Sequence, residues 1–454
     1  MCKILQFMKY PYVLFFLFLI SCQKDVITND TILPIVNSVK PTDEFKGYVV
    51  NIKNKQDAVD YWKNNLVLPD LITVVFQKPS NVNNVRYGSF LLSLTTGDFN
   101  NDSCIDVFNG GAAYKGQLTN STFLIWNPTT KKFEDKNLFN DGTISLGNPV
   151  KVMSIEFNND NYVDLVIFGH GDEGLVDAIN EPISIALSDG KGKYKIVKLT
   201  ELIPTELQRF TIEGGDMGDL NGDGLMDLFV ACNSHTFIFW GIPSSPYFTN
   251  KNYSHFATDT TNFKSNNGFG EVVPEMAEVY SAKIYDVNND KLNDIILNSS
   301  ERDGSTHKVM INQGNGKFNK NSTIKLPLYD GVGGIGIGLQ DCVVDDLNND
   351  GLNDIIGLIN LSGQSWNIVT YIQQKNGTFI IDKNYFQVDN STYKGPPSSL
   401  IYYDFNGDGK KDITYTDDAD NGQIIYKSVF IRNDNKFKQE SFYKYDSYAN
   451  SIKK

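Results

Sequence analysis

Short apolar runs recur along the chain and alternate with polar segments rich in Asn, Asp and Gly. Leu165–Ile167, Leu228–Val230 and Ile295–Leu297 are examples, and each run begins directly after an acidic residue. Runs of this length, bounded by turn-forming residues, predict β-strands rather than helices. The many Tyr and Phe residues favour strands as well. We therefore expect an all-β domain in which polar loops connect buried strands.

One polar segment of nine residues occurs six times, and successive copies start 58 to 67 residues apart. Acidic residues occupy its positions 1, 5 and 9, Asn occupies position 3, and position 2 is apolar. Position 4 is Asn or Gly in every copy, and both residues tolerate the left-handed backbone of a tight loop. The six copies are Asp98–Asp106, Glu156–Asp164, Asp219–Asp227, Asp286–Asp294, Asp346–Asp354 and Asp404–Asp412.

This motif has the chemistry of a calcium loop, because calcium is a hard cation that takes roughly six to eight oxygen ligands. An EF-hand is excluded, since its loop needs a Glu at position 12 and no copy has one there. We expect up to six Ca²⁺ ions, each held by the side chains of positions 1, 3, 5 and 9 and the main-chain carbonyl of position 7. These ligands are Asp98, Asn100, Asp102, Cys104, Asp106; Glu156, Asn158, Asp160, Tyr162, Asp164; Asp219, Asn221, Asp223, Leu225, Asp227; Asp286, Asn288, Asp290, Leu292, Asp294; Asp346, Asn348, Asp350, Leu352, Asp354; Asp404, Asn406, Asp408, Lys410 and Asp412.

Position 6 differs between the copies. It is Gly in copies three, five and six, and it is Ser103, Asn161 and Lys291 in the others. Ser and Lys are poorly suited to a left-handed turn. We therefore expect looser calcium sites in copies one and four.

A second turn rich in Asn, Asp and Gly lies further along most repeats and is closed by an aromatic residue. Asn-Gly and Asp-Gly steps between apolar runs are hairpin signals. Together with the strands on either side of each loop, they predict four strands per repeat. The turns are Ser188–Tyr194, Asn312–Phe318, Lys375–Phe379 and Asn433–Phe437.

Six copies in register resemble the FG-GAP or VCBS-type repeats of integrin α-chain propellers and of many bacterial surface proteins. The resemblance covers residues 88–445. It implies a β-propeller with one four-stranded blade per repeat and calcium in the loop between the first two strands. We expect six blades, while residues 46–87 form either an N-terminal cap or a degenerate seventh blade. The Phe-Gly and Gly-Ala-Pro letters of the signature are mostly missing, so the resemblance concerns architecture rather than ligand.

The N-terminus has the pattern of a lipoprotein signal peptide. Lys9 precedes an apolar stretch at residues 13–20 that is too short to remain as a membrane-spanning helix. The stretch ends at Leu19–Cys22, which resembles the bacterial lipobox, in which the Cys is acylated and becomes the first mature residue. We expect residues 1–21 to be removed, Cys22 to be lipidated, and residues 22–45 to be a flexible tether. This predicts a bacterial protein anchored by lipid to the outer membrane or cell surface; the alternative is an ordinary signal peptide with a chance Cys.

The net charge of the chain limits the classes of molecule that it is expected to bind. A net charge of −13 argues against nucleic acid, whose phosphates require clustered Lys and Arg. Three like charges in each loop repel one another without calcium, so we expect chelation to lower the melting temperature. Beyond Cys22 three widely spaced cysteines remain, which fit buried free thiols rather than a disulfide framework or a zinc site. They are Cys104, Cys232 and Cys342.

Three other features are candidates for function. Gly331–Gly336 matches G-x-G-x-x-G, but it runs into a predicted strand rather than a helix, which favours close packing over nucleotide binding. His170, followed by Asp172 and Glu173, is either a solvated loop residue or part of a ligand-binding face. Trp240 lies beside a Pro-rich turn and a polar insertion, and it is either core or an exposed platform for a sugar.

We expect a binding protein that recognises a glycan or a surface protein, with calcium in a structural role and no catalytic residues. Two alternatives stay open. One is a calcium-dependent polysaccharide lyase or hydrolase, which would need His, Lys, Arg or Tyr to converge at one mouth of the propeller. The other is a structural subunit of an outer-membrane complex. Residues 446–454 are expected to be a C-terminal tail.

Overall fold

The computed structural model describes residues 94–441 with gaps. The gaps of six residues or more are 170–181, 204–211, 258–269, 273–278, 300–306, 330–337, 387–399 and 404–409. The predicted signal peptide with Cys22, the tether, the region 46–87 and the C-terminal tail lie outside the described residues, so their boundaries stay predictions. No helix within the described part of the chain has the length and apolar character needed to cross a bilayer.

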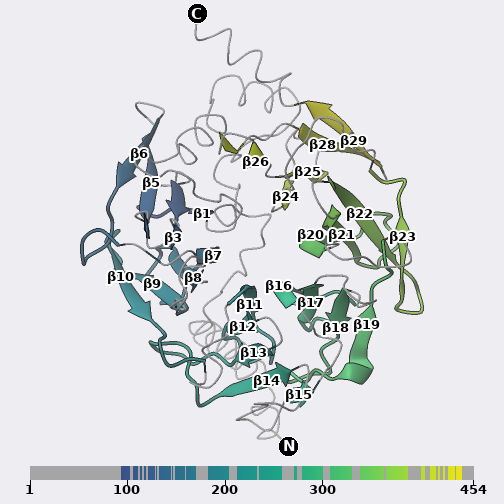
Figure 1. Ribbon diagram of the computed structural model, residues 1–454, viewed down its shortest axis with the longest axis horizontal. Helices are drawn as coiled ribbons and strands as arrows, with labels where there is room; N and C mark the ends of the chain where they lie inside the picture. Colours follow the sequence, from purple (N-terminus) through teal and green to yellow (C-terminus); the bar gives the residue numbers. More distant parts are fainter. Residues whose placement is uncertain are drawn as a thin grey trace, which may run out of the picture.

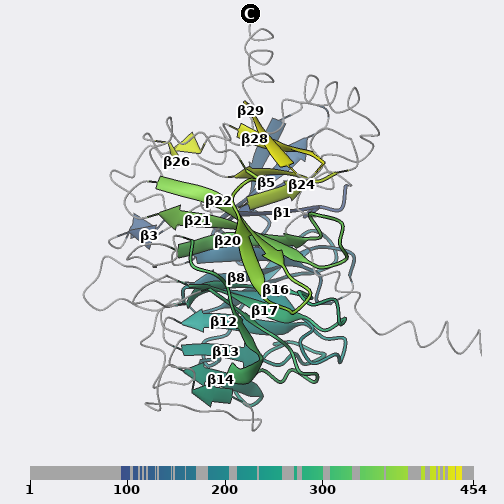
Figure 2. The same cartoon turned by 90° about the vertical axis from the view of Figure 1, so that its right-hand side faces the viewer.

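The protein is an all-β propeller. Six antiparallel sheets follow one another in sequence order around a common centre, with the first strand of each sheet innermost (Figure 1). Figure 2 shows the same sheets from the side. The strands of the first three sheets are β1 Leu94–Gly97, β2 Asp106–Asn109, β5 Thr122–Asn127 and β6 Lys132–Lys136; β7 Pro149–Ile155, β8 Asp164–Gly169, β9 Ser184–Ser188 and β10 Tyr194–Lys198; β11 Gly214–Gly218, β12 Asp227–Cys232, β13 His235–Phe239, β14 Tyr253–Ala257 and β15 Gly270–Val272.

The other three sheets repeat the four-stranded order. Two further hairpins, β3 Ala113–Tyr114 with β4 Gln117–Leu118 and β26 Asp418–Ala419 with β27 Gln423–Ile424, lie between the second and third strands of the first and sixth sheets. A short 3-10 helix, η5, spans Lys320–Ser322. The strands are β16 Val279–Tyr285, β17 Asp294–Ser299, β18 Lys308–Met310 and β19 Thr323–Lys325; β20 Gly338–Asp345, β21 Asp354–Leu361, β22 Ser365–Gln373 and β23 Phe379–Asp382; β24 Leu400–Tyr403, β25 Asp412–Tyr415, β28 Ser428–Asn433 and β29 Lys436–Ser441.

The strand prediction from sequence is confirmed. Each nine-residue motif connects the first two strands of a sheet, and the second turn connects the last two strands. That turn has the expected left-handed glycines: Gly190 and Gly192 have φ of 70° and 76°. The third sheet departs from the pattern, because its longer connection leads to a fifth strand, β15, which pairs parallel to β14.

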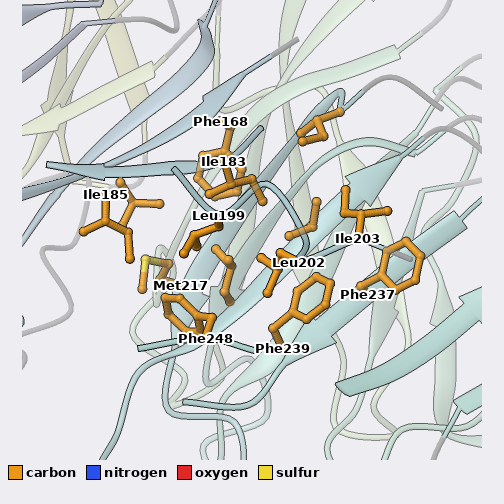
Figure 3. Close-up of a cluster of buried hydrophobic side chains, with 14 of the residues drawn as sticks. Phe168, Ile183, Ile185, Leu199, Leu202, Ile203, Met217, Phe237, Phe239 and Phe248 are labelled. Carbon is orange, nitrogen blue, oxygen red and sulfur yellow. The ribbon is translucent and has the colours of Figure 1, made fainter. Parts of the chain in front are cut away.

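Hydrophobic side chains pack between neighbouring sheets. The largest cluster joins the second and third sheets and includes Phe168, Phe237 and Phe239, none of which is exposed (Figure 3). Similar clusters join the first sheet to the second, the third to the fourth, the fourth to the fifth and the fifth to the sixth. Burying one such side chain stabilises the fold by about 1.5–3 kcal/mol. The series of clusters therefore fixes each sheet against the next and holds the loops at one face.

Trp240 belongs to the core, so the prediction of an exposed sugar platform is wrong. It is 6% exposed and packs between the third and fourth sheets. A Cβ atom on Gly316 would lie 2.2 Å from the Trp240 ring, which shows how closely the next sheet covers the indole. The Pro-rich turn after Trp240 exposes its own backbone and leaves the ring inside.

Candidate metal centre

The aspartate at position 9 anchors each loop to its sheet. Asp294 is fully buried; its Oδ2 accepts a hydrogen bond from the Val287 N–H at 2.9 Å and its Oδ1 accepts one from the Asn312 N–H at 2.8 Å. The first donor is position 2 of the same loop, and the second lies at the end of the third strand. The same pair of bonds recurs in loops two, three and five, at Asp164, Asp227 and Asp354.

The carboxylate at position 1 closes the turn in loops three, four and five. In loop four, Asp286 Oδ1 accepts from the Asp290 N–H at 3.1 Å, and Oδ2 accepts from the Lys291 N–H at 2.9 Å. Asp346 accepts the equivalent bonds in loop five. Lys291 adopts a left-handed φ of 71°, which costs an ordinary residue about 1–2 kcal/mol. Loop four therefore keeps the geometry of its neighbours under strain, and its looser affinity stays a prediction.

Loop two has a carboxylate oxygen with no hydrogen-bond partner. Asp160 Oδ1 accepts from the Tyr162 N–H at 2.8 Å, whereas its Oδ2 is buried and has no partner among the described residues. A buried, unpaired carboxylate oxygen is costly unless a cation or a donor satisfies it. The Asp160 side chain also lies 3.5 Å from the place where a Cβ on Gly190 would stand, so the hairpin closes over it.

The acidic groups of each loop lie close enough to oppose ionisation. The pKa of Asp294 is raised from 3.8 to about 7: burial is the largest cause, the nearby Asp290 and Asp286 carboxylates add to it, and the two backbone hydrogen bonds act against it. The pKa values of the position 9 aspartates in loops two, three and five rise for the same reasons: Asp164 and Asp227 to about 7, and Asp354 to about 6. A bound cation would reverse this effect by favouring the charged form.

The donor set fits calcium in its chemistry. Every ligand predicted from the sequence is a carboxylate, amide or carbonyl oxygen, and the left-handed residues that curl the loop are in place. No group of three or more His, Cys, Asp or Glu side chains is placed to hold a metal within the described residues. The amide at position 3 is not one of these side chains. In loops two to five the position 9 carboxylate, which the sequence predicts as a ligand, accepts backbone N–H groups on both of its oxygens. Residues 404–409 of loop six lie outside the described residues, and Asp412 accepts from the Arg432 N–H at 2.8 Å.

Neighbouring loops are hydrogen-bonded to one another, which the sequence did not reveal. Asn293, at position 8 of loop four, donates from Nδ2 to the Asp219 carbonyl at position 1 of loop three, at 2.9 Å. Asn353, at position 8 of loop five, donates to the Asp286 carbonyl of loop four at 2.7 Å. Asn289 completes the link by donating to the Gly351 carbonyl at 2.9 Å. Loops three, four and five therefore form one connected network.

A donor side chain from the end of the third strand, from the turn after it, or from the start of the fourth strand also reaches back to the preceding sheet. Asn312 donates to the Leu220 carbonyl at 2.7 Å, and the Tyr194 hydroxyl lies 3.2 Å from the Phe99 carbonyl. Arg432 does the same in the sixth sheet, where it donates to the Leu347 carbonyl at 2.9 Å. The acceptor is in each case the carbonyl at position 2 of the preceding loop. We call this contact the inter-sheet latch.

Four charged side chains lie on the innermost strands and pair with one another. Lys151 on β7 lies 3.3 Å from Asp216 on β11, and Lys283 on β16 lies 3.0 Å from Asp341 on β20. All four side chains are at most 14% exposed. The backbone N–H groups of Ile284 and Leu400 donate to Asp216 and Asp341. This arrangement ties five successive sheets together, from the second to the sixth, and favours a structural role for these ions over catalysis.

The remaining candidates have mixed outcomes. His170 and the glycine-rich segment 331–336 lie outside the described residues. His235 and His255, which the sequence did not connect, are buried neighbours in the third sheet, with Nδ1 and Nε2 3.0 Å apart. They lie on the adjacent strands β13 and β14. The two histidines are separated by a long connection, so their positions in the sequence do not indicate that they pair. Cys232 and Cys342 are buried free thiols as expected, and Cys104 lies outside the described residues.

Comparison with known proteins identifies the repeats. The family model for the FG-GAP-like repeat matches residues 156–230 and 346–415. This chain carries FG-GAP-like repeats. The two matched segments hold loops two and three and loops five and six, so the FG-GAP-like match falls on the motif that the sequence singled out. No curated protein matches the chain significantly.

The chain is also similar to solved structures at low identity. These include the periplasmic gluconolactonase of Pseudomonas aeruginosa (12% identity, TM-score 0.46, covering 74% of this chain and 81% of that one). The Vibrio cholerae biofilm matrix protein Bap1 has 12% identity and a TM-score of 0.34, covering 69% and 41%. The exotype rhamnogalacturonan lyase YesX has 12% identity and a TM-score of 0.38, covering 78% and 57%. With TM-scores below 0.5, these likenesses support no statement about function.

Proposed function

We propose that this protein is a calcium-stabilised β-propeller, anchored by lipid to the outer membrane or cell surface, that binds a glycan or a protein. The calcium role rests on one observation above the others. Loop two buries a carboxylate oxygen of Asp160 without a partner, in a loop whose other groups are all oxygen donors. A cation in the loop would satisfy that oxygen and relieve the repulsion among its acidic groups.

The binding role is supported by the way the fold holds its loops. Each nine-residue loop connects the first strand of a sheet to its second strand, and loops on a rigid scaffold often carry recognition. The ionisable groups on the innermost strands are paired with one another, which favours binding over catalysis. The lipid anchor rests on the sequence pattern that ends at Cys22. These features together support a surface binding protein.

Thermal melting of the purified protein tests the calcium role. At a calcium concentration a hundredfold above the dissociation constant, each filled site adds about 2.7 kcal/mol to the free energy of unfolding. We expect calcium to raise the melting temperature clearly, EGTA to reverse the change, and magnesium to have a smaller effect. Asp290→Asn, in loop four, should reduce the calcium effect, whereas Asp141→Asn, at an exposed site outside the loops, should not. An EGTA melt that coincides with the calcium melt would refute the proposal.

Affinity electrophoresis tests the binding role. The calcium-loaded protein is run through gels that contain different polysaccharides, and its migration is compared with that in EGTA. Retardation by one polymer that EGTA abolishes would support glycan binding. No retardation by any polymer would favour a protein ligand, and would leave the result of the calcium melt unaffected.

A further inference from the structure

A cavity of about 310 Å³ lies at the loop end of the innermost strands. Its walls come from the last residues of β7, β11 and β16, together with residues of loops three, four and five. Figure 1 shows these three strands side by side near the centre of the molecule. This volume is at the lower end of the range for small-molecule sites, which is roughly 300–1,000 Å³. The cavity is therefore suited to one small ring rather than to an extended polymer.

Part of the lining of the cavity is apolar. Met153 from the second sheet, Met226 from loop three and Ile284 from the fourth sheet contribute to it. Methionine side chains are flexible and polarisable, so they adapt to the face of a bound ring. These residues favour a ligand with at least one apolar face.

Other lining residues offer hydrogen-bond acceptors. Asn293 and Asn353 line the cavity, and each uses its Nδ2 to hold the carbonyl of the preceding loop. Their Oδ1 atoms therefore serve as acceptors, and the amides are fixed in orientation before any ligand arrives. These acceptors select a ligand that carries hydroxyl donors.

The charge of the lining favours a neutral ligand. Among the described residues, no Lys, Arg or His lines the cavity, which disfavours an anion. Of the two acidic residues that line it, Asp216 pairs with Lys151 and accepts from the Ile284 N–H at 2.7 Å, whereas Asp286 is a predicted ligand of the calcium ion in loop four, which would offset its charge. An ammonium group would therefore gain little from them.

We propose that this cavity binds one neutral sugar residue, with its hydroxyl groups on the amides of Asn293 and Asn353 and its apolar face on the apolar part of the lining. The inference rests on the proposed binding of a glycan, and it adds the place of the site and the chemical class of the sugar.

Isothermal titration calorimetry in calcium tests the proposal. The probes are methyl glycosides of glucose, galactose, mannose and fucose as neutral sugars, galacturonate as an anion and glucosamine as a cation. Met153→Phe fills the cavity from one wall and Ile284→Phe fills it from another. Ile380→Phe, on an outer strand where Ile380 is 51% exposed, is the matched control. We expect a neutral glycoside to bind, at least tenfold weaker binding to a filled variant, and unchanged binding to the control.

The outcomes separate this inference from the proposed function. Thermal melts in calcium show whether Met153→Phe and Ile284→Phe fold. If one of them does not fold, glycoside binding by the other tests the site. A neutral glycoside that binds all variants equally would overturn the site and leave glycan binding intact. Binding of only galacturonate or glucosamine would overturn the chemical class. If no monosaccharide binds while a polysaccharide still retards the protein in gels, the cavity is not the glycan site.

Discussion

Arg432 gives the sharpest test of how the sheets are joined. Its side chain is 9% exposed and reaches from the sixth sheet to the fifth. There it donates to the Leu347 carbonyl at 2.9 Å and pairs with Asp345 at 3.2 Å. The Tyr402 hydroxyl also lies 3.3 Å from it. We predict that Arg432→Ala destabilises the protein through the loss of this latch.

The magnitude follows from the burial of the two partners. Removing one member of a buried ion pair costs about 3–5 kcal/mol, because the other charge is left without compensation. Asp345 is 36% exposed, so water relieves part of that cost, and we expect about 2–4 kcal/mol. Lys410→Ala is the control on the same sheet. It breaks an exposed pair with Asp434, in which the two side chains are 42% and 86% exposed, and should cost at most about 1 kcal/mol.

Urea unfolding, followed by tryptophan fluorescence, measures both variants against the parent protein. Hydrogen exchange adds the location, since β24, β25, β28 and β29 should lose protection before the earlier sheets. The reasoning would be refuted if Arg432→Ala were no less stable than Lys410→Ala. The loss of stability in Arg432→Lys should lie between those of Arg432→Ala and Lys410→Ala, because a lysine keeps the charge but cannot reach the carbonyl and the carboxylate with one planar group.

Two further predictions concern the loops. The position 9 aspartates have raised pKa values in the folded protein, so their contribution to stability is full below about pH 4 and is lost as the pH rises through 6 to 7. The melting temperature in EGTA should therefore rise as the pH is lowered from 8 to 5, while calcium should make the melting temperature less dependent on pH. A melting temperature in EGTA that falls as the pH is lowered from 8 to 5 would contradict the prediction. Asn353→Ala removes the bond to the Asp286 carbonyl and should make calcium binding by loops four and five less cooperative in calorimetric titrations, whereas Asn140→Ala at an exposed turn should have no effect. Equal cooperativity in both variants would show that the loops bind independently.

The sequence predicted the local structure well, because the local pattern determines it. The apolar residue at position 2, the left-handed residues at positions 4 and 6, and the Gly-rich hairpins each depend on a few neighbouring residues. Phe99, Leu220, Val287 and Leu347 are buried as the pattern requires. The loops therefore fell in the right place between the right strands.

The contacts between sheets could not be predicted in this way. Asn353 and Asp286 are 67 residues apart, and no periodicity in the chain signals that one amide will find the other's carbonyl. The burial of Trp240 has the same origin, since the next sheet covers it and its own repeat gives no sign of this. The cavity likewise arises where three sheets and three loops meet. Each of these features depends on the packing of whole sheets.

The inter-sheet latch has a consequence for how such a protein diversifies. The acceptor is always a main-chain carbonyl, which every residue type provides, while the donor is Tyr194, Asn312 or Arg432 in different sheets. A substitution at the acceptor position therefore does not break the joint, and the donor can come from different positions of the repeat, provided that its side chain has sufficient reach. Repeats joined in this way can drift apart in sequence, or be duplicated and exchanged, without needing a matched partner next to them.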